Sequence, residues 1–153
     1  MSEFLETTYD KFIFRVKTDC LYTRDDLWVR MEGNTATLGV ADFRQKANGD
    51  VAFLETVSPG TTAKQGQALG VIETIKATAD ILSPVNGKVV AVNPELEASP
   101  FLINQDPYGA GWLYRIELSD PQGDRAGLLD AAAYFELMKQ KVAAEAKKLY
   151  GQS

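Results

Sequence analysis

The residue best placed for chemistry is Lys76, at the centre of the segment Val71–Leu82, VIETIKATADIL. An antiparallel pairing centred between Lys76 and Ala77 places Glu73 opposite Asp80, with isoleucines beyond them on both sides. The pattern predicts a β-hairpin whose two turn residues are Lys76 and Ala77. Two-residue turns favour Asn-Gly or other glycine pairs, because they need positive φ. A Lys-Ala turn breaks this rule and therefore marks a possible functional site.

A lysine at a hairpin tip projects its amine away from the body, where another enzyme can reach and modify it. An unmodified surface lysine is the alternative interpretation. The flanking sequence favours presentation, because turn signals enclose the hairpin at Pro59-Gly60, Gln65-Gly66 and Ser83–Gly87. The order is turn, strand, lysine tip, strand, turn.

Histidine is absent and Cys20 is the single cysteine. These counts exclude Ser-His-Asp and Cys-His catalysis and histidine-based zinc sites, so we expect no metal site. A single cysteine cannot form an internal disulfide, which fits a reducing compartment. We expect Cys20 to be a buried structural residue.

The elements needed to hold such a hairpin are short strands with turns between them, which is typical of a β-sandwich or barrel. Strands are expected at residues 11–17, 27–31, 35–40, 51–54, 68–73, 78–82, 88–93 and 112–118. Residues 41–47 can form one or two helical turns, and residues 94–105 a loop or short helix. In the first strand, Phe12, Phe14 and Val16 are expected on one side.

The C-terminal part predicts a helix over residues 130–150, with Asp130 as N-cap and Gly151 after its end. One helical stripe is apolar and is expected to pack on the β core. Its members are Tyr134, Met138, Val142, Ala146 and Leu149.

The hairpin and its flanks resemble biotinyl and lipoyl carrier domains. Biotinyl domains usually have methionines on both sides of their lysine, whereas here the neighbours are Ile75 and Ala77. With acids at Glu73 and Asp80, the segment looks like a lipoyl acceptor.

The wider resemblance is to the glycine cleavage H-protein family and runs from about Tyr22 to Leu137. The matching motifs occur in the family's order. They are Tyr22-Thr23, Trp28-Val29, Gly39-Val40, Asp42-Phe43, Gly49-Asp50, Glu73, Lys76-Ala77, Ser83-Pro84-Val85, Gly87, Val89, Val92-Asn93, Asn104, Pro107-Tyr108-Gly109 and Gly111-Trp112-Leu113.

This resemblance implies a mainly β, barrel-sandwich hybrid fold with short helices and a C-terminal α-helix. Residues 1–153 would form a single lipoyl-carrier domain, with 1–17 as an N-terminal extension and the helix at 130–150 packed on the β core. Lipoate would be attached covalently to Lys76, and Glu73, Ala77 and Asp80 would serve tip recognition. Such a protein carries a covalently held group for other enzymes and is not itself an enzyme.

The sequence departs from the family at Asp26 and Leu27, where the family usually has His then Glu, and that histidine lies near the cargo-bearing arm. Three functions therefore remain open. The first is an H-protein that shuttles an aminomethyl group. The second is a lipoate-binding protein that carries sulfur to a heterodisulfide-reductase-like complex in sulfur oxidation. The third is an unlipoylated H-like interaction domain.

The partners implied are a lipoate-attaching enzyme and, for glycine cleavage, glycine decarboxylase, aminomethyltransferase and dihydrolipoamide dehydrogenase. The net charge of −5 argues against sequence-independent nucleic-acid binding. The apolar runs are too short for a transmembrane helix, and the N-terminus does not resemble a signal peptide. We expect a cytoplasmic monomer in which Lys76 is exposed and Trp28, Trp112 and Leu113 are largely buried.

Overall fold

The computed structural model describes residues 3–149, with side chains described through residue 145. Short strands dominate, and the helices are placed between and after them. The strands are β1 Phe4–Tyr9, β2 Phe12–Lys17, β3 Leu21–Tyr22, β4 Leu27–Glu32, β5 Thr35–Val40, β6 Val51–Thr56, β7 Thr62–Ala63, β8 Ala68–Thr74, β9 Thr78–Leu82, β10 Gly87–Val92 and β11 Tyr114–Leu118. The helices are α1 Asp42–Asn48, the 3-10 turn η1 Pro94–Leu96, α2 Leu102–Gln105, α3 Pro121–Ala126 and α4 Ala131–Leu149.

Two sheets enclose the main core. A six-stranded sheet has the order β3-β4-β5-β11-β10-β7, and a three-stranded sheet has the order β6-β8-β9. Apolar side chains from both sheets meet between them, including Leu38, Ile72, Ile81 and Ile116. This mainly β arrangement agrees with the expected barrel-sandwich hybrid.

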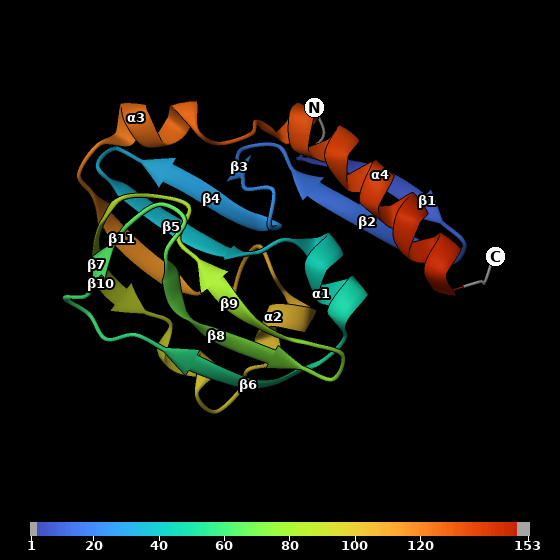
Figure 1. Ribbon diagram of the computed structural model, residues 1–153, viewed down its shortest axis with the longest axis horizontal. Coiled ribbons are helices and arrows are strands. Elements are labelled where there is room, and N and C mark those ends of the chain that lie inside the picture. Colours follow the sequence, from blue (N-terminus) through green and yellow to red (C-terminus); the bar gives the residue numbers. More distant parts are fainter. Residues whose placement is uncertain (1–2, 150–153) are drawn as a thin grey trace.

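A second cluster joins the two ends of the chain. The β1–β2 hairpin and α4 lie together at one end of the molecule, far from β7 and β10 (Figure 1). Buried Val16 of the hairpin and Met138 of α4 share this cluster with Trp28 of β4. The rings of Tyr22 and Tyr134 stack within it, with centroids 4.4 Å apart and planes inclined by 6°.

The C-terminal helix begins as expected. The Asp130 carboxylate accepts a hydrogen bond from the Ala133 amide at 2.8 Å, which caps the first turn. Tyr134, Met138 and Val142 are buried along one stripe. Gly151 and the side chains of Ala146 and Leu149 lie outside the described residues.

The structure adds detail to several sequence expectations. Phe12, Phe14 and Val16 lie on one side of β2, as expected, and Phe14 and Val16 are buried whereas Phe12, at the outer end of the hairpin, is 47% exposed. Trp28 and Leu113 are buried, whereas Trp112 is only partly buried and packs against the Arg115 guanidinium. The last strand begins at Tyr114 rather than at Trp112.

The sequence did not predict β1, the two short strands β3 and β7, or α3. The acids and threonines of β1 obscured its strand pattern, and α3 is a single short helix that Asp120 caps. Within residues 3–149, no helix is long and apolar enough to cross a bilayer.

Candidate functional site

Lys76 lies at the tip of the β8–β9 hairpin, but the hairpin is centred one residue earlier than expected. Ile72 pairs with Ala79 and Glu73 pairs with Thr78, so the two turn residues are Ile75 and Lys76. Glu73 is therefore not opposite Asp80, which pairs with Val71. The expected Lys76-Ala77 turn was wrong because the pattern of this segment is nearly symmetrical about either centre.

Thr74 closes the turn in place of a glycine. Its hydroxyl accepts hydrogen bonds from the backbone N–H of Lys76 at 3.3 Å and of Ala77 at 3.1 Å. It also lies 3.1 Å from the Ala77 carbonyl oxygen, to which it can donate. The Thr74 N–H donates to the same oxygen at 2.8 Å. Neither turn residue has positive φ, so this side-chain cap explains how the turn forms without glycine.

The segment after α1 packs against the turn that carries Lys76. The Ile75 N–H donates to the Asp50 carbonyl oxygen at 3.2 Å. A Cβ added to Gly49 would lie 2.8 Å from the Ile75 side chain, so Gly49 leaves the space that Ile75 occupies. Asn104 of α2 fixes this segment, because its amide donates to the Gly49 carbonyl and accepts from the Val51 N–H. The tip is thus anchored to the body through its backbone.

The side chains at the tip face solvent. Glu73, Lys76, Ala77 and Asp80 are all exposed, as expected for Lys76. Within the described part of the chain, the Lys76 ammonium forms no hydrogen bond or ion pair. An accessible, unpaired amine on an anchored turn fits the attachment of a carboxylic acid through an amide.

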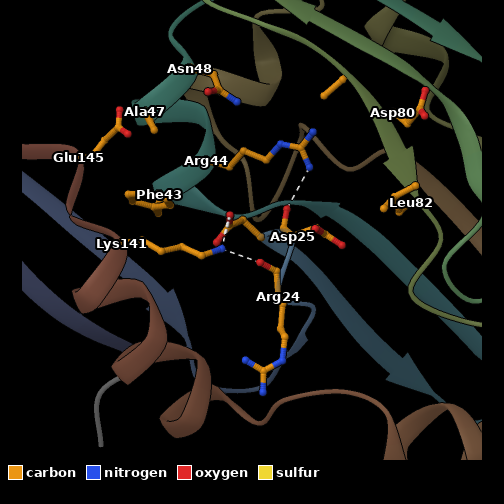
Figure 2. Close-up of a pocket in the computed structure, with 12 residues that line it drawn as sticks. Arg24, Asp25, Phe43, Arg44, Ala47, Asn48, Asp80, Leu82, Lys141 and Glu145 are labelled. Carbon is orange, nitrogen blue, oxygen red and sulfur yellow. Dashed lines mark hydrogen bonds and ion pairs between the residues drawn. The ribbon is translucent and has the colours of Figure 1, made fainter. Parts of the chain in front are cut away.

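A pocket of about 530 Å³ lies beside β9 and extends toward α4 (Figure 2). The three elements that enclose it are β9, α1 and the turn before β4, with Lys141 and Glu145 of α4 at one side. Asp80 lines this pocket and therefore connects it to the hairpin that carries Lys76.

Arg44 of α1 is the buried cation of the pocket and is 9% exposed. Its guanidinium donates to the Asp25 carbonyl oxygen at 3.0 Å and fixes the turn before β4. Burial lowers the pKa of Arg44, and the nearby carboxylates of Asp26 and Asp25 partly oppose that change.

Asp26, which stands where the family usually has histidine, anchors α4 to this pocket. Its carboxylate accepts from the Tyr134 hydroxyl at 2.7 Å and pairs with Lys141 at 2.9 Å. The same Lys141 ammonium donates to the Arg24 carbonyl oxygen at 2.5 Å. Burial and the Asp26 charge raise the pKa of Tyr134, so this hydroxyl remains a donor. Asp26 thus has a structural role, because it links α4 to the turn before β4.

Sequence reasoning missed the residues that support the site. Thr74 was not among the predicted site residues, although a threonine before a turn that lacks glycine is a signal for a hydroxyl cap. Arg44 carried no signal, and Asp26 carried only the signal of a departure from the family. Cys20 is buried as expected, and burial raises its thiol pKa to about 12.

A two-sheet β core that presents an exposed lysine on a hairpin tip defines the class of lipoyl and biotinyl carrier domains. The family model described as glycine cleavage H-protein matches residues 20–141. The glycine cleavage system H protein of Symbiobacterium thermophilum is 46% identical over 125 residues, which cover 82% of this chain and 97% of that relative. The protein of the same name from Myxococcus xanthus is 45% identical over 121 residues, covering 79% of this chain and 93% of that protein.

The crystal structure of a glycine cleavage system H protein from Mycobacterium marinum superposes with a TM-score of 0.72 at 30% identity. The superposition covers 82% of this chain and 98% of the Mycobacterium marinum chain. The chain belongs to the glycine cleavage H-protein family. This membership confirms the expected barrel-sandwich fold and lipoyl-carrier function, and it does not favour sulfur carriage or an unmodified interaction domain.

Proposed function

We propose that lipoate is attached through an amide to Nζ of Lys76, and that the protein serves glycine cleavage through this lysine. The observation that carries the proposal is the exposed, unpaired Lys76 ammonium on a tip that Thr74 caps. Bound lipoate supplies a sulfur pair that accepts a group, releases it and is reoxidised by thiol–disulfide exchange.

The chain itself supplies a rigid attachment point for the lipoyl group. The Thr74 hydroxyl accepts from the Lys76 N–H, and the Ile75 N–H donates to the Asp50 carbonyl oxygen. These bonds hold the tip in one conformation, so an attaching enzyme meets Lys76 in a defined geometry. Exposed Glu73 and Asp80 offer carboxylates on either side of the tip, where they can orient that enzyme. Tethering then raises the effective concentration of the carried group at each docked partner.

The proposed partners are the lipoate-attaching enzyme, glycine decarboxylase, aminomethyltransferase and dihydrolipoamide dehydrogenase. A carrier needs no general base of its own, which fits a pocket whose Asp26 is already engaged by Tyr134 and Lys141. We further propose a monomer in the cytoplasm, where the single thiol of Cys20 would meet reducing conditions.

Intact-mass measurement after incubation with a lipoate ligase, ATP and lipoate tests the attachment. We expect a mass gain of one lipoyl group in the wild type and in Lys88→Arg, and no gain in Lys76→Arg. Lys88 is a matched control because it is equally an exposed lysine but lies on strand β10 rather than in a turn. A gain that persists in Lys76→Arg would refute the assignment.

A glycine decarboxylation exchange assay tests the pathway. The lipoylated protein should support exchange of bicarbonate with the glycine carboxyl group in the presence of glycine decarboxylase, and unlipoylated protein should not. Failure of fully lipoylated protein in this assay would refute the role in glycine cleavage while leaving the attachment site intact.

A further inference from the structure

The pocket beside β9 contains a buried charge that lacks a charged partner. Arg44 of α1 is 9% exposed. Within the described part of the chain, its guanidinium donates one hydrogen bond, to the Asp25 carbonyl oxygen at 3.0 Å, and forms no ion pair. A guanidinium has five N–H donors, and a buried charge is usually paired. Most donors of Arg44 are therefore free to bind a ligand.

The Arg44 side chain is directed into this pocket. Figure 2 shows it extending from α1 toward β9, which carries Asp80 and Leu82. Arg24, the other arginine of the lining, extends away from it. Arginine binds carboxylates through two parallel hydrogen bonds, an arrangement that a lysine cannot form. The inner part of the pocket thus favours a carboxylate group.

The other charges of the pocket disfavour a ligand that is only an anion. Lys141 and Asp26 form an ion pair and neutralise each other. The remaining charged groups of the lining are three carboxylates and two guanidinium groups, from Asp25, Asp80, Glu145, Arg24 and Arg44. A simple anion would meet a net negative lining, and a simple cation would meet Arg44. A ligand that carries both charges avoids either repulsion.

Asp25 is the carboxylate best placed for the positive group of such a ligand. Its backbone carbonyl binds the Arg44 guanidinium, so its carboxylate extends from the residue that contacts Arg44. Burial lowers the pKa of Arg44, and the charges of Asp26 and Asp25 partly oppose that change. Asp26 is already bound to Tyr134 and Lys141. Asp25 is exposed and has no ion pair within the described residues, so it is open to an ammonium group.

The apolar part of the lining defines a third group of the ligand. Ala47 of α1 and Ala79 and Leu82 of β9 are half-buried in the pocket wall, and Phe43 is buried behind it. The volume of about 530 Å³ lies within the range of small-molecule sites, roughly 300–1,000 Å³. The pocket therefore has space for an aliphatic group beside the two charges.

We propose that this pocket binds an α-amino acid with an apolar side chain. The ligand carboxylate accepts hydrogen bonds from the Arg44 guanidinium, and the ligand ammonium pairs with the Asp25 carboxylate. The ligand side chain packs on Ala79 and Leu82. This inference goes beyond the proposed function and does not depend on lipoate at Lys76.

NMR titration of the isotope-labelled full chain with L-leucine tests the site. Isocaproate keeps the carboxylate and the aliphatic chain of leucine, and isoamylamine keeps the amine and that chain. We expect leucine to shift the backbone amides of residues 24–26, 43–48 and 79–82 with one dissociation constant. Each single-charge probe should bind about tenfold more weakly, as for the loss of a hydrogen bond to a charged group. Isocaproate that binds as tightly as leucine would overturn the assignment of an amino acid.

The variant Arg44→Gln tests the carboxylate contact, and Arg24→Gln is the matched control at the same pocket. We expect the leucine affinity to fall about tenfold in Arg44→Gln and to stay unchanged in Arg24→Gln. Asp25→Asn keeps the backbone carbonyl that Arg44 binds, and it should weaken leucine about tenfold without weakening isocaproate. Because Asp25 is exposed, this variant tests the site even if Arg44→Gln does not fold.

Three results would refute the site. The first is the absence of amide shifts with leucine. The second is an equal loss of affinity in Arg24→Gln and Arg44→Gln. The third is a wild-type affinity for leucine in Asp25→Asn. Melting temperatures equal to that of the wild type exclude unfolding as the cause of a weaker affinity.

Discussion

The Thr74 hydroxyl lies 3.1 Å from both the N–H and the carbonyl oxygen of Ala77, and so spans the turn that presents Lys76. A single side chain thereby satisfies the backbone of a turn that has no glycine. We expect the geometry of Lys76 to depend on this hydroxyl more than on the neighbouring side chains.

Replacing Thr74 by valine tests that dependence, because valine keeps the shape and loses the hydroxyl. We expect Thr74→Val to lower the free energy of unfolding by about 1 kcal/mol, the typical contribution of one hydrogen bond. We also expect slower lipoylation of Lys76, measured by intact mass over time. Thr78→Val is the control, since Thr78 is an exposed strand threonine next to the same turn. Equal lipoylation rates in the two variants would contradict the role of the cap.

The close approach of Gly49 to the Ile75 side chain allows a second test of how the turn is held. Alanine at Gly49 meets positive φ, +81°, and the Ile75 side chain at 2.8 Å. Gly33→Ala is the control for backbone strain, because Gly33 has φ +63° and an open environment. Backbone strain costs alanine roughly 1–2 kcal/mol in a left-handed conformation. The cost is higher at Gly49, because its φ of +81° with ψ of −164° is adopted almost only by glycine. We expect Gly49→Ala to lose more stability in urea than Gly33→Ala, and we expect Ile75→Ala to reduce that difference by relieving the side-chain clash. No rescue by Ile75→Ala would show that the contact is unimportant.

Because Tyr134 and Lys141 of α4 both bind the Asp26 carboxylate, we expect the stability losses from removing the two contacts to be coupled. Tyr134→Phe keeps the stacking on Tyr22 but removes the donor to the Asp26 carboxylate. Hydrogen bonds to charged groups contribute about 1.5–3 kcal/mol, and we expect a loss in this range from urea unfolding. Lys141→Met removes the second partner. In the double variant the two losses should not add, because both side chains act on one carboxylate. Additive losses would indicate independent roles.

The sequence allowed prediction of the fold class and of the tip to within one residue, but not of the contacts between distant segments. The alternation of apolar residues from Ile72 to Ile81 identifies two paired strands, and it fits either turn centre equally well. The structure selects one centre through Thr74, Gly49 and Asp50, which the alternation does not include.

Asp26 shows the other limit of prediction from one sequence. Its partners Tyr134 and Lys141 are 108 and 115 residues away along the chain. Local pattern marks Tyr134 as part of an apolar stripe and Asp26 as a turn residue. Their contact follows only from how α4 packs against the turn before β4.

Cys20 gives a prediction for the dependence of stability on pH. Burial first, and the neighbouring Asp19 second, raise its thiol pKa from 9.0 to about 12. Between these values the unfolded chain loses the thiol proton while the folded protein keeps it. The unfolded state then binds fewer protons, so the free energy of unfolding falls as pH rises above about 9. We expect Cys20→Ala to show a shallower decline than the wild type between pH 9 and 10 in urea titrations.

Alkylation by iodoacetamide checks the same thiol directly. At pH 8 the folded protein should react far more slowly than protein unfolded in urea, because Cys20 is 2% exposed and remains a neutral thiol. Free cysteine is the reference for full reactivity. Rapid alkylation of the folded protein, at a rate near that of free cysteine, would mean that this thiol is open to solvent. Cys20 would then be a reactive group rather than part of the buried cluster in which the β1–β2 hairpin and α4 pack against Trp28 of β4.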